Sequence, residues 1–364
     1  MAANNRIFYA SQAIALLPQN SDGTSILGDW IYPKGVQSVG ITTNFNLEQV
    51  FELGQIDIYD QVEDVPEVEV TINKVLDGTP PLYLMCVGGS GGISGASGKE
   101  LPNIANNRVN FRLGIFSDSE TAATGTPRHF VDCSGMYLSS VSFTFPVDGN
   151  ATEDVTLVGN SKYWNSGSLF SATTDKFSNG SGTSPSTIRR YSVALGESTL
   201  PTGIGGIPAP SGRASGRPYL QNITISTDLG REAINEIGRM APYHRYVNFP
   251  VEVTSEFEVV AADGDQMEAN DFESSAGCGT IYKNLTDKIV NVVVCGTGTN
   301  DRLGINLGNK NKLTSVNYTG GDTGGGNATV TYSFQTFNKL IVTGSGSFVD
   351  ANYVDEDDDV GISD

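Results

Sequence analysis

The sequence is poor in histidine, the residue that most often carries acid–base and metal chemistry near neutral pH. It has two, His129 and His244, in 364 residues. Neither stands in a catalytic-triad pattern or an HExxH motif. His244, within "PYHRY", is interpreted as a structural turn residue. We therefore predict that the protein is not an enzyme.

Cysteine is also scarce. The four cysteines are Cys86, Cys133, Cys278 and Cys295. They form no CxxC pair and no cluster with histidine, which argues against a zinc site. No other pattern implies a metal or a cofactor, so none is predicted. We expect the cysteines to be buried free thiols rather than disulfides, as in a protein made in a reducing cytoplasm.

Long apolar runs and basic charge are lacking as well. No uninterrupted apolar run reaches the length of about 18 residues that a membrane span needs. The start, "MAANNRIFYASQAIALLPQN", lacks the basic segment and continuous apolar core of a signal peptide. We expect a protein that is soluble, at least until it assembles. The net charge of −19, from 22 basic and 41 acidic residues, argues against tight binding of nucleic acid, but not against enclosing it without holding it.

Several motif-like stretches do not support chemistry. The glycine run from Gly88 to Glu100 fails as a phosphate-binding loop, because Ile93 replaces a required glycine and Glu100 a required Ser or Thr. Acidic pairs such as Asp57 and Asp60 are expected by chance among 41 acids, and are interpreted as solvated surface. The run "EDDD" near the C-terminus lacks the ligand spacing of a calcium loop.

Glycine, by contrast, is abundant. The chain has 43 glycines among many Thr, Val and Tyr residues, a composition that favours short strands joined by tight turns. A length of 364 residues fits two domains, or one domain with large insertions.

The chain also contains an internal repeat. The stretches "ELGQIDIYDQVEDVPEVEVT" from Glu52 and "EIGRMAPYHRYVNFPVEVT" from Glu236 share a Gly, a Tyr five residues later and a Pro seven residues after that Tyr. Further along, "LSSVSFT" from Leu138 corresponds to "LTSVNYT" from Leu313, and "GNAT" follows each of them. Between these anchors, "RVNFRLGIF" and "KIVNVVVCG" both have the composition of a buried strand. The shared order predicts a tandem duplication.

Each copy is predicted to contain a strand, a short capped helix and a second strand. Asn46 and Asp228 are good N-caps, and Gly54 and Gly238 would end the two helices. An alternating Val/Glu run then follows in each copy, with one apolar and one acidic face. The predicted fold is therefore mainly β: two tandem β-sandwich or half-barrel modules, each with a short flanking α-helix.

Composition suggests the boundaries of these modules. Residues 1–29 are interpreted as an N-terminal arm, 30–165 as the first module and 215–345 as the second. Residues 166–214 are rich in Ser, Gly and Pro, and are interpreted as a linker or surface insertion. Residues 346–364 form an acidic tail that is predicted to be disordered.

Two stretches of the first copy, "FELGQIDIYDQVEDVPEVEVTINKVLDG" and "YLSSVSFTFPVDGNATEDVTLVGN", and one of the second, "YLQNITISTDLGREAINEIGRMAPYHRYVNFPVEVT", carry a family resemblance. They look like the tail tube proteins of tailed bacteriophages. The resemblance implies modules whose inner sheets close into a ring barrel around a lumen that conducts DNA, normally with six modules per ring. A duplicated chain then implies three subunits per ring.

The resemblance also implies roles for particular residues and partners. The candidate lumen-facing acids are Glu67, Glu69, Glu252, Glu256 and Glu258. The candidate loop for contacts with the next ring contains Gly88, Gly91, Gly95 and Lys99. Expected partners are further copies of the chain, other tail proteins (tape measure, baseplate or tip, terminator and, in a contractile tail, sheath) and viral DNA that passes without specific binding. The protein would be made in the host cytoplasm and reside in the virion tail, with no membrane partner.

One alternative stays open, a two-domain β-rich virion module for decoration or receptor binding. Such a module would need a concave aromatic patch, and Trp30 and Trp164 are too few and too scattered to indicate one. Spontaneous polymerisation would favour the tube protein, whereas a ligand-dependent rise in melting temperature would favour the alternative.

Overall fold

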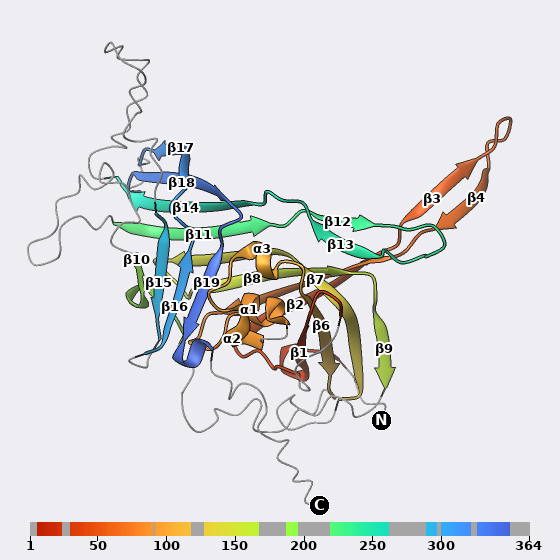
Figure 1. Cartoon of the computed structure of the whole chain (residues 1–364), viewed down its shortest axis with the longest axis horizontal. Coiled ribbons are helices and arrows are strands. Elements are labelled where there is room, and N and C mark those ends of the chain that lie inside the picture. Colours follow the sequence, from red (N-terminus) through yellow and green to blue (C-terminus); the bar gives the residue numbers. More distant parts are fainter. Residues whose placement is uncertain are drawn as a thin grey trace, which may run out of the picture.

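The computed structural model describes residues 6–23, 30–89, 92–117, 127–166, 187–195, 219–261, 289–296, 300–321 and 326–349. Within these ranges the chain consists mainly of antiparallel strands, with three short α-helices (Figure 1). The prediction of a mainly β fold is confirmed.

The described strands divide almost evenly between the two halves of the chain. The first half contains β1 (Gln12–Gln19), β2 (Val36–Asn44), β3 (Leu47–Phe51), β4 (Ile58–Glu63), β5 (Glu67–Val75), β6 (Arg108–Ile115), β7 (His129–Pro146), β8 (Thr152–Gly159) and β9 (Tyr163–Ser166). The second contains β10 (Val193–Leu195), β11 (Leu220–Asp228), β12 (Arg231–Ile234), β13 (His244–Val247), β14 (Glu252–Val260), β15 (Asn291–Cys295), β16 (Arg302–Asn306), β17 (Lys312–Thr319), β18 (Thr329–Phe337) and β19 (Ile341–Ser345).

One long antiparallel sheet runs through both halves, in the order β17-β18-β14-β11-β7-β8-β5-β2. Strand β7 is 18 residues long, and its first half leaves this sheet to pair with β6 and β9, while β6 pairs with β1. A separate sheet, β10-β15-β16-β19, belongs to the second half and runs steeply across the long sheet in Figure 1. Each half is therefore a two-sheet sandwich, and the long sheet joins the two.

The duplication is visible residue by residue. Strand β2, "VQSVGITTN", corresponds to β11, "LQNITISTD", at a constant spacing of 184 residues. Both strands carry a β-bulge at the same place, after Val36 in β2 and after Leu220 in β11. The pair "LSSVSFT" and "LTSVNYT" likewise shares a bulge, after Leu138 in β7 and after Leu313 in β17. The anchors follow each other in the predicted order. The sequence analysis treated Asn46 and Asp228 as equivalent, whereas the structure makes Asp228 the counterpart of Asn44, two positions earlier.

The repeat also reaches into the segments interpreted as arm and linker. Strand β1 precedes the first module's long-sheet strands and pairs with β6. Strand β10 does the same in the second module and pairs with β15. A short 3-10 turn, Tyr9–Ser11 or Arg190–Ser192, precedes each of these strands. Both strands pair in the same way with the outer sheet of their own module.

The two capped helices predicted after Asn46 and Asp228 are wrong. The segments form β-hairpins instead, β3–β4 and β12–β13. Gly54 and Gly238 lie in the hairpin loops with φ of 96° and 91°, in the left-handed region that glycine adopts without steric cost. In the first of these segments the apolar side chains Leu47, Val50 and Phe51 are exposed, so their helical spacing did not report a buried helical face.

The glycine run that contains the candidate inter-ring loop lies among three short helices. It includes α2 (Gly92–Ala96) and is flanked by α1 (Leu82–Val87) and α3 (Leu101–Ile104). All six residues of α1 are buried. Gly88 packs so closely on Gly92 that a Cβ atom would lie 2.8 Å from the backbone of Gly92. Here the small residues allow close packing rather than flexibility.

A single hydrophobic cluster connects both modules along the apolar face of the long sheet. It includes Val70 and Phe143 in the first module and Phe257 and Phe334 in the second, all at most 1% exposed. Burying each Phe contributes about 1.5–3 kcal/mol. The two modules therefore share a core and do not behave as separate domains on a flexible linker.

The described cysteines are free. Cys86 and Cys133 are buried, as predicted, whereas Cys295 is exposed, so the prediction of burial is wrong there. Cys278 lies outside the described residues. Burial raises the pKa of Cys133 to about 11, which keeps it a thiol at neutral pH.

Candidate assembly interface

The long sheet has one face that consists almost entirely of polar side chains. Residues that stand opposite each other on neighbouring strands share a face, so the pairing register defines its members. Their central rows are Thr42, Glu69, Thr71, Asn73, Thr156, Asp154, Ser142, Ser226, Thr254, Gln335, Glu256, Ser333, Ser315 and Asn317. In the eight strands of this path, all of them described, the basic residue on this face is Lys312, at its outer end.

The five candidate acids all lie on this polar face, in two columns. Glu67 and Glu69 are on β5, while Glu252, Glu256 and Glu258 are on β14. Three strands, β11, β7 and β8, separate the columns. Their role as a lumen wall stays a prediction. The same face also carries Asp154 on β8 and Asp228 on β11, which the sequence analysis missed although both stand in alternating polar patterns.

Some of these acids have partners already. Asp154 accepts a hydrogen bond from Asn73 Nδ2 at 2.6 Å, and Glu256 accepts one from Ser333 Oγ at 3.4 Å. Glu67 accepts a hydrogen bond from Arg245 Nη1 at 2.9 Å. Glu252 and Glu256 are exposed. The acidic column on β14 is thus more open than the one on β5.

The central joint of the long sheet lies between the modules, where β11 pairs with β7. Ile225 stands opposite Phe143 on the apolar face, and Ser226 stands opposite Ser142 on the polar face. Phe143 is fully buried and Ile225 is 1% exposed. At this joint β7, at the inner end of the first module's part of the long sheet, pairs with β11, at the inner end of the second module's part.

Hairpin β12–β13 follows β11 directly and docks on the first module. Its entry residue, Leu229, is 1% exposed, and its amide donates to the carbonyl of Ser139 at 2.8 Å. Arg231 donates to the carbonyl oxygens of Leu138 and Ala105.

Aromatic and ionic contacts also hold hairpin β12–β13 on the first module. The Arg231 guanidinium lies 5.1 Å from the centre of the Tyr137 ring, and its burial lowers the pKa of Arg231 to about 10, so it stays charged at neutral pH. His244 stacks on Tyr246 with ring centres 4.2 Å apart, and burial lowers the pKa of His244. Together with the pair between Arg245 and Glu67, these contacts fix the hairpin on the first module.

Hairpin β3–β4 has the same construction, but within the described residues it does not pack against another part of the chain in this way. Figure 1 shows it projecting from the body of the molecule. Every residue of both strands is exposed. Its exposed large apolar side chains, with the flanking Phe45, are Phe45, Leu47, Val50, Phe51, Leu53, Ile56, Ile58, Tyr59 and Val62. A cluster of this size on a soluble protein normally marks an interaction surface.

The two outer edges of the long sheet, β2 and β17, show the same contrast. Position by position, β2 is more exposed than its counterpart β11 over residues 37–43, and β17 is more exposed than the matching part of β7. Tyr318 is 50% exposed, while Phe143 at the same position of the repeat is fully buried. Each outer edge strand therefore has the exposure expected of a central-joint strand whose neighbouring strand is absent.

Comparisons with known proteins add little to this geometry. No protein-family profile matches the sequence, and no curated protein matches it. Among solved structures, a chain of the anti-feeding prophage baseplate, determined by cryo-electron microscopy and six-fold symmetrised, is similar with a TM-score of 0.32 and 8% identity. The match covers 45% of this chain and 97% of that chain. A similarity this low does not establish a shared fold or function.

The candidate inter-ring residues are less exposed to solvent than expected. Gly88 is buried, Gly95 is half-buried in α2, Lys99 is exposed, and Gly91 lies outside the described residues. The segment around them contacts the second module, since the amide of Gly98 donates to the carbonyl of Val342 at 2.9 Å. It ties the modules together, and its role between rings stays a prediction.

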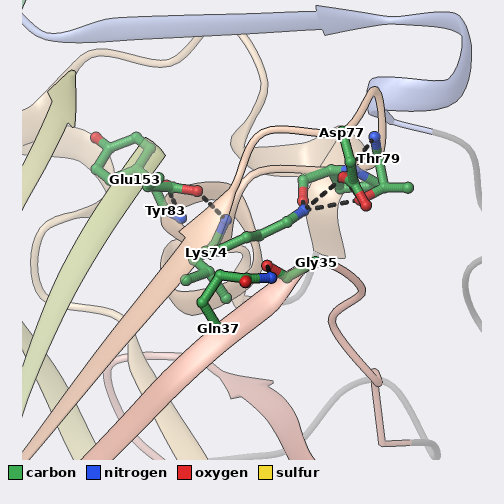
Figure 2. A network of polar contacts seen from close by, with 9 residues as sticks. Gly35, Gln37, Lys74, Asp77, Thr79, Tyr83 and Glu153 are labelled. Carbon is green, nitrogen blue, oxygen red and sulfur yellow. Dashed lines mark hydrogen bonds and ion pairs between the residues drawn. The ribbon is translucent and has the colours of Figure 1, made fainter. Parts of the chain in front are cut away.

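The most buried ionisable groups lie under α1, where Figure 2 shows them. Glu153 on β8 accepts hydrogen bonds from the amides of Leu82 and Tyr83, each at 2.7 Å. Lys74 stands opposite Glu153 on β5 and points its Nζ the other way, to Thr79 Oγ1 at 2.7 Å. Burial raises the pKa of Glu153 to about 7, although Lys74 and the two amides oppose that shift. Because these groups hold the start of α1 and the turn before it, we interpret them as structural.

None of the helices in the described ranges is long and apolar enough to cross a membrane. Within the same ranges, His, Cys, Asp and Glu side chains form no group of three or more that could hold a metal ion.

Proposed function

We propose that this chain is a tail tube subunit of a bacteriophage-like particle, and that three copies close one ring. In each ring the long sheets of the three copies join edge to edge. The polar face of the closed sheet lines the lumen, and the outer sheets and helices face outward. Rings of this kind stack into the tube through which DNA leaves the particle.

The single observation that carries this proposal is the relation between the edges and the central joint. Strands β2 and β11 are the same strand of the repeat, and so are β17 and the long-sheet half of β7. Because β11 already pairs with β7 inside the chain, β2 of one copy can pair with β17 of the next in the same way. Closure pairs the two edges that the described strands leave unpaired, β2 and β17, which would otherwise invite unspecific pairing.

The polar face supports the role of a conduit. It carries the five candidate acids with Asp154 and Asp228, and Lys312 lies at its margin. An acidic wall repels the phosphate backbone at short range, where salt screens least. DNA would therefore pass without adhering, in agreement with a chain that carries a net charge of −19.

The same proposal places the protein in the virion tail. Its partners would be copies of itself and the tail proteins at the two ends of the tube. Neither catalysis nor a cofactor is part of the proposal.

Sedimentation velocity and negative-stain electron microscopy of concentrated protein test it. The proposal predicts closed rings with the mass of three chains, which stack into hollow tubes. A protein that stays monomeric at high concentration, even with a tail-initiating complex present, would overturn the proposal and leave the two-domain decoration or receptor-binding module as the better interpretation.

A further inference from the structure

We infer that hairpin β3–β4 binds the second module of a neighbouring copy, with Phe45 as its buried anchor, in the way that β12–β13 binds the first module within the chain. Strand β2 would pair with β17 of that copy in the register that β11 and β7 keep. This inference rests on the proposed ring, because it names the contact that joins one copy to the next.

The two hairpins correspond residue for residue. Leu47 stands opposite Glu63, and 184 positions later Arg231 stands opposite Val247. The same spacing relates every described pair of β12 and β13 to a pair of positions in β3 and β4. It also relates the loop glycines, Gly54 and Gly238, which have similar positive φ values. The two hairpins therefore have the same backbone design but different surroundings.

The anchor position shows the difference most clearly. Phe45 is the counterpart of Leu229 at the entry to the hairpin. Leu229 is 1% exposed against the first module, while Phe45 is 70% exposed. Arg245 is 7% exposed, and its counterpart, Gln61, is exposed. A large aromatic side chain held open at a position that its repeat buries points to a partner of matching shape.

The central joint also supplies the register of the outer one. Each residue of β11 lies 184 positions after its counterpart in β2, and each residue of β17 lies 175 positions after its counterpart in β7. The internal pair Ser226 and Ser142 then becomes Thr42 opposite Asn317 on the polar face. On the apolar face, the pair Ile225 and Phe143 becomes Ile41 opposite Tyr318. The remaining transferred pairs are Ser38 with Gly321, Val39 with Gly320, Gly40 with Thr319, Thr43 with Val316 and Asn44 with Ser315.

The surface that would bind β3–β4 occupies the equivalent position to the surface that binds β12–β13, but its residues differ in chemistry. The amide of Leu229 donates to Ser139, so the amide of Phe45 would donate to the carbonyl of Thr314 in the neighbouring copy. Arg245 and Glu67 form an ion pair, whereas their counterparts are Gln61 and Glu252. The outer contact therefore depends more on apolar burial and less on charge than the inner one.

A second copy of this chain is the occupant, and no other partner is needed to explain the surface. The open edge and the hairpin lie on one continuous segment, residues 36–63, as do β11 and β12–β13. Their complement, the β17 edge, lies at the far end of the same sheet. The two surfaces cannot meet within one chain, because six strands separate β2 from β17.

Cysteine cross-linking tests the register. In a background with C278S and C295S, T42C/N317C places two thiols directly opposite each other, at a Cβ separation of about 4.5–5.5 Å. The matched control T42C/S315C shifts one thiol by two residues on the same face. We expect oxidation to link three chains into a covalent ring for T42C/N317C, with at least tenfold less linking for the control. Equal or absent linking in both variants would overturn the register.

A pair of serine substitutions tests the hairpin. F45S removes the anchor, and Y191S removes an aromatic side chain that is 78% exposed in the turn Arg190–Ser192, outside the hairpin and both sheet edges. We expect F45S to raise the concentration needed for assembly at least tenfold, and Y191S to leave it unchanged. Equal effects would overturn the anchor role. Tubes that form without the T42C/N317C link would overturn the inference and leave the proposed function standing, whereas a protein that never assembles would overturn both.

Discussion

Lys74 and Glu153 stand opposite each other on β5 and β8, both fully buried, and Val259 and Val330 take the same two places in the second module. One repeat thus has a buried basic and acidic pair where the other has an apolar pair. The difference follows from α1, because Glu153 receives two amide donors from the start of that helix. Buried charges are costly unless their hydrogen bonds are satisfied, and here the first turn of α1 supplies those bonds.

Replacing Lys74 with Met should destabilise the protein strongly. Lys74 Nζ lies 3.3 Å from Asp77 Oδ1 and donates to Pro80 and Thr79. Its removal leaves the buried Asp77 carboxylate without its cation, which costs about 3–5 kcal/mol. Urea unfolding below the assembly concentration measures the loss. The control K312M, at an exposed position, should stay within about 0.5 kcal/mol; a K74M variant as stable as this control would contradict the structural role of Lys74.

The stability of the protein should depend on Glu153 through pH. The folded chain holds the pKa of Glu153 at about 7, above its ordinary value of 4.5. The folded state therefore keeps a proton that the unfolded state has lost, so this contribution is complete below about pH 4.5 and declines as pH rises to about 7. The slope is at most about 1.4 kcal/mol per pH unit.

The variant E153Q isolates this contribution. It cannot titrate at that position. The unfolding free energy of the wild type should therefore fall relative to that of E153Q as the pH rises from 5 to 7.5. Parallel pH profiles for the two proteins would show that Glu153 stays ionised in the folded chain.

Charge placed across the proposed joint should control assembly. Thr42 and Asn317 are both exposed in the single chain, so substitutions there should leave its fold intact. T42K/N317K brings two like charges face to face and should raise the assembly concentration, because directly opposed like charges on paired strands repel. T42K/N317E restores an attractive pair and should assemble at about the wild-type concentration. Light scattering against concentration separates these cases, and equal behaviour of both variants would argue against this pairing.

The acidic face should keep DNA from adhering to the lumen. In E252K/E256K, two exposed acids of β14 become basic, and tubes of this variant should retain DNA that wild-type tubes release. Co-sedimentation of tubes with short duplex DNA at low salt measures retention, which should fall steeply as salt rises. The control E52K/D57K makes the same charge change at the tip of β3–β4, where both residues are exposed. Equal retention by both variants would assign the effect to net charge rather than to the face.

Much of the fold was readable from the sequence, since strand propensity and repeated anchors indicate it directly. The pairs "LSSVSFT" with "LTSVNYT" and "GNAT" with "GNAT" report equivalent strands because their turns and bulges demand the same residue types. The alternating runs at Glu67 and Glu252 likewise reported β5 and β14 with one acidic face. These features are local, and local patterns suffice to predict them.

What the sequence did not reveal depends on long-range contacts. Leu47, Val50 and Phe51 have helical spacing, but they form a strand because β4 pairs with them and no core lies beneath. Glycine-rich residues 88–98 suggested flexibility, yet they pack closely between α1 and the second module. The contrast between Phe45 and Leu229 could not be predicted either, because two equivalent positions differ only in what the fold places against them.

Cryo-electron microscopy of the assembled tube is the decisive measurement, because it resolves which strands meet between chains. We expect one closed inner sheet of 3 × 8 = 24 strands per ring, with β2 of each chain paired to β17 of the next and Thr42 opposite Asn317. Rings in which β2 and β17 remain unpaired, or in which other surfaces join the chains, would contradict this expectation.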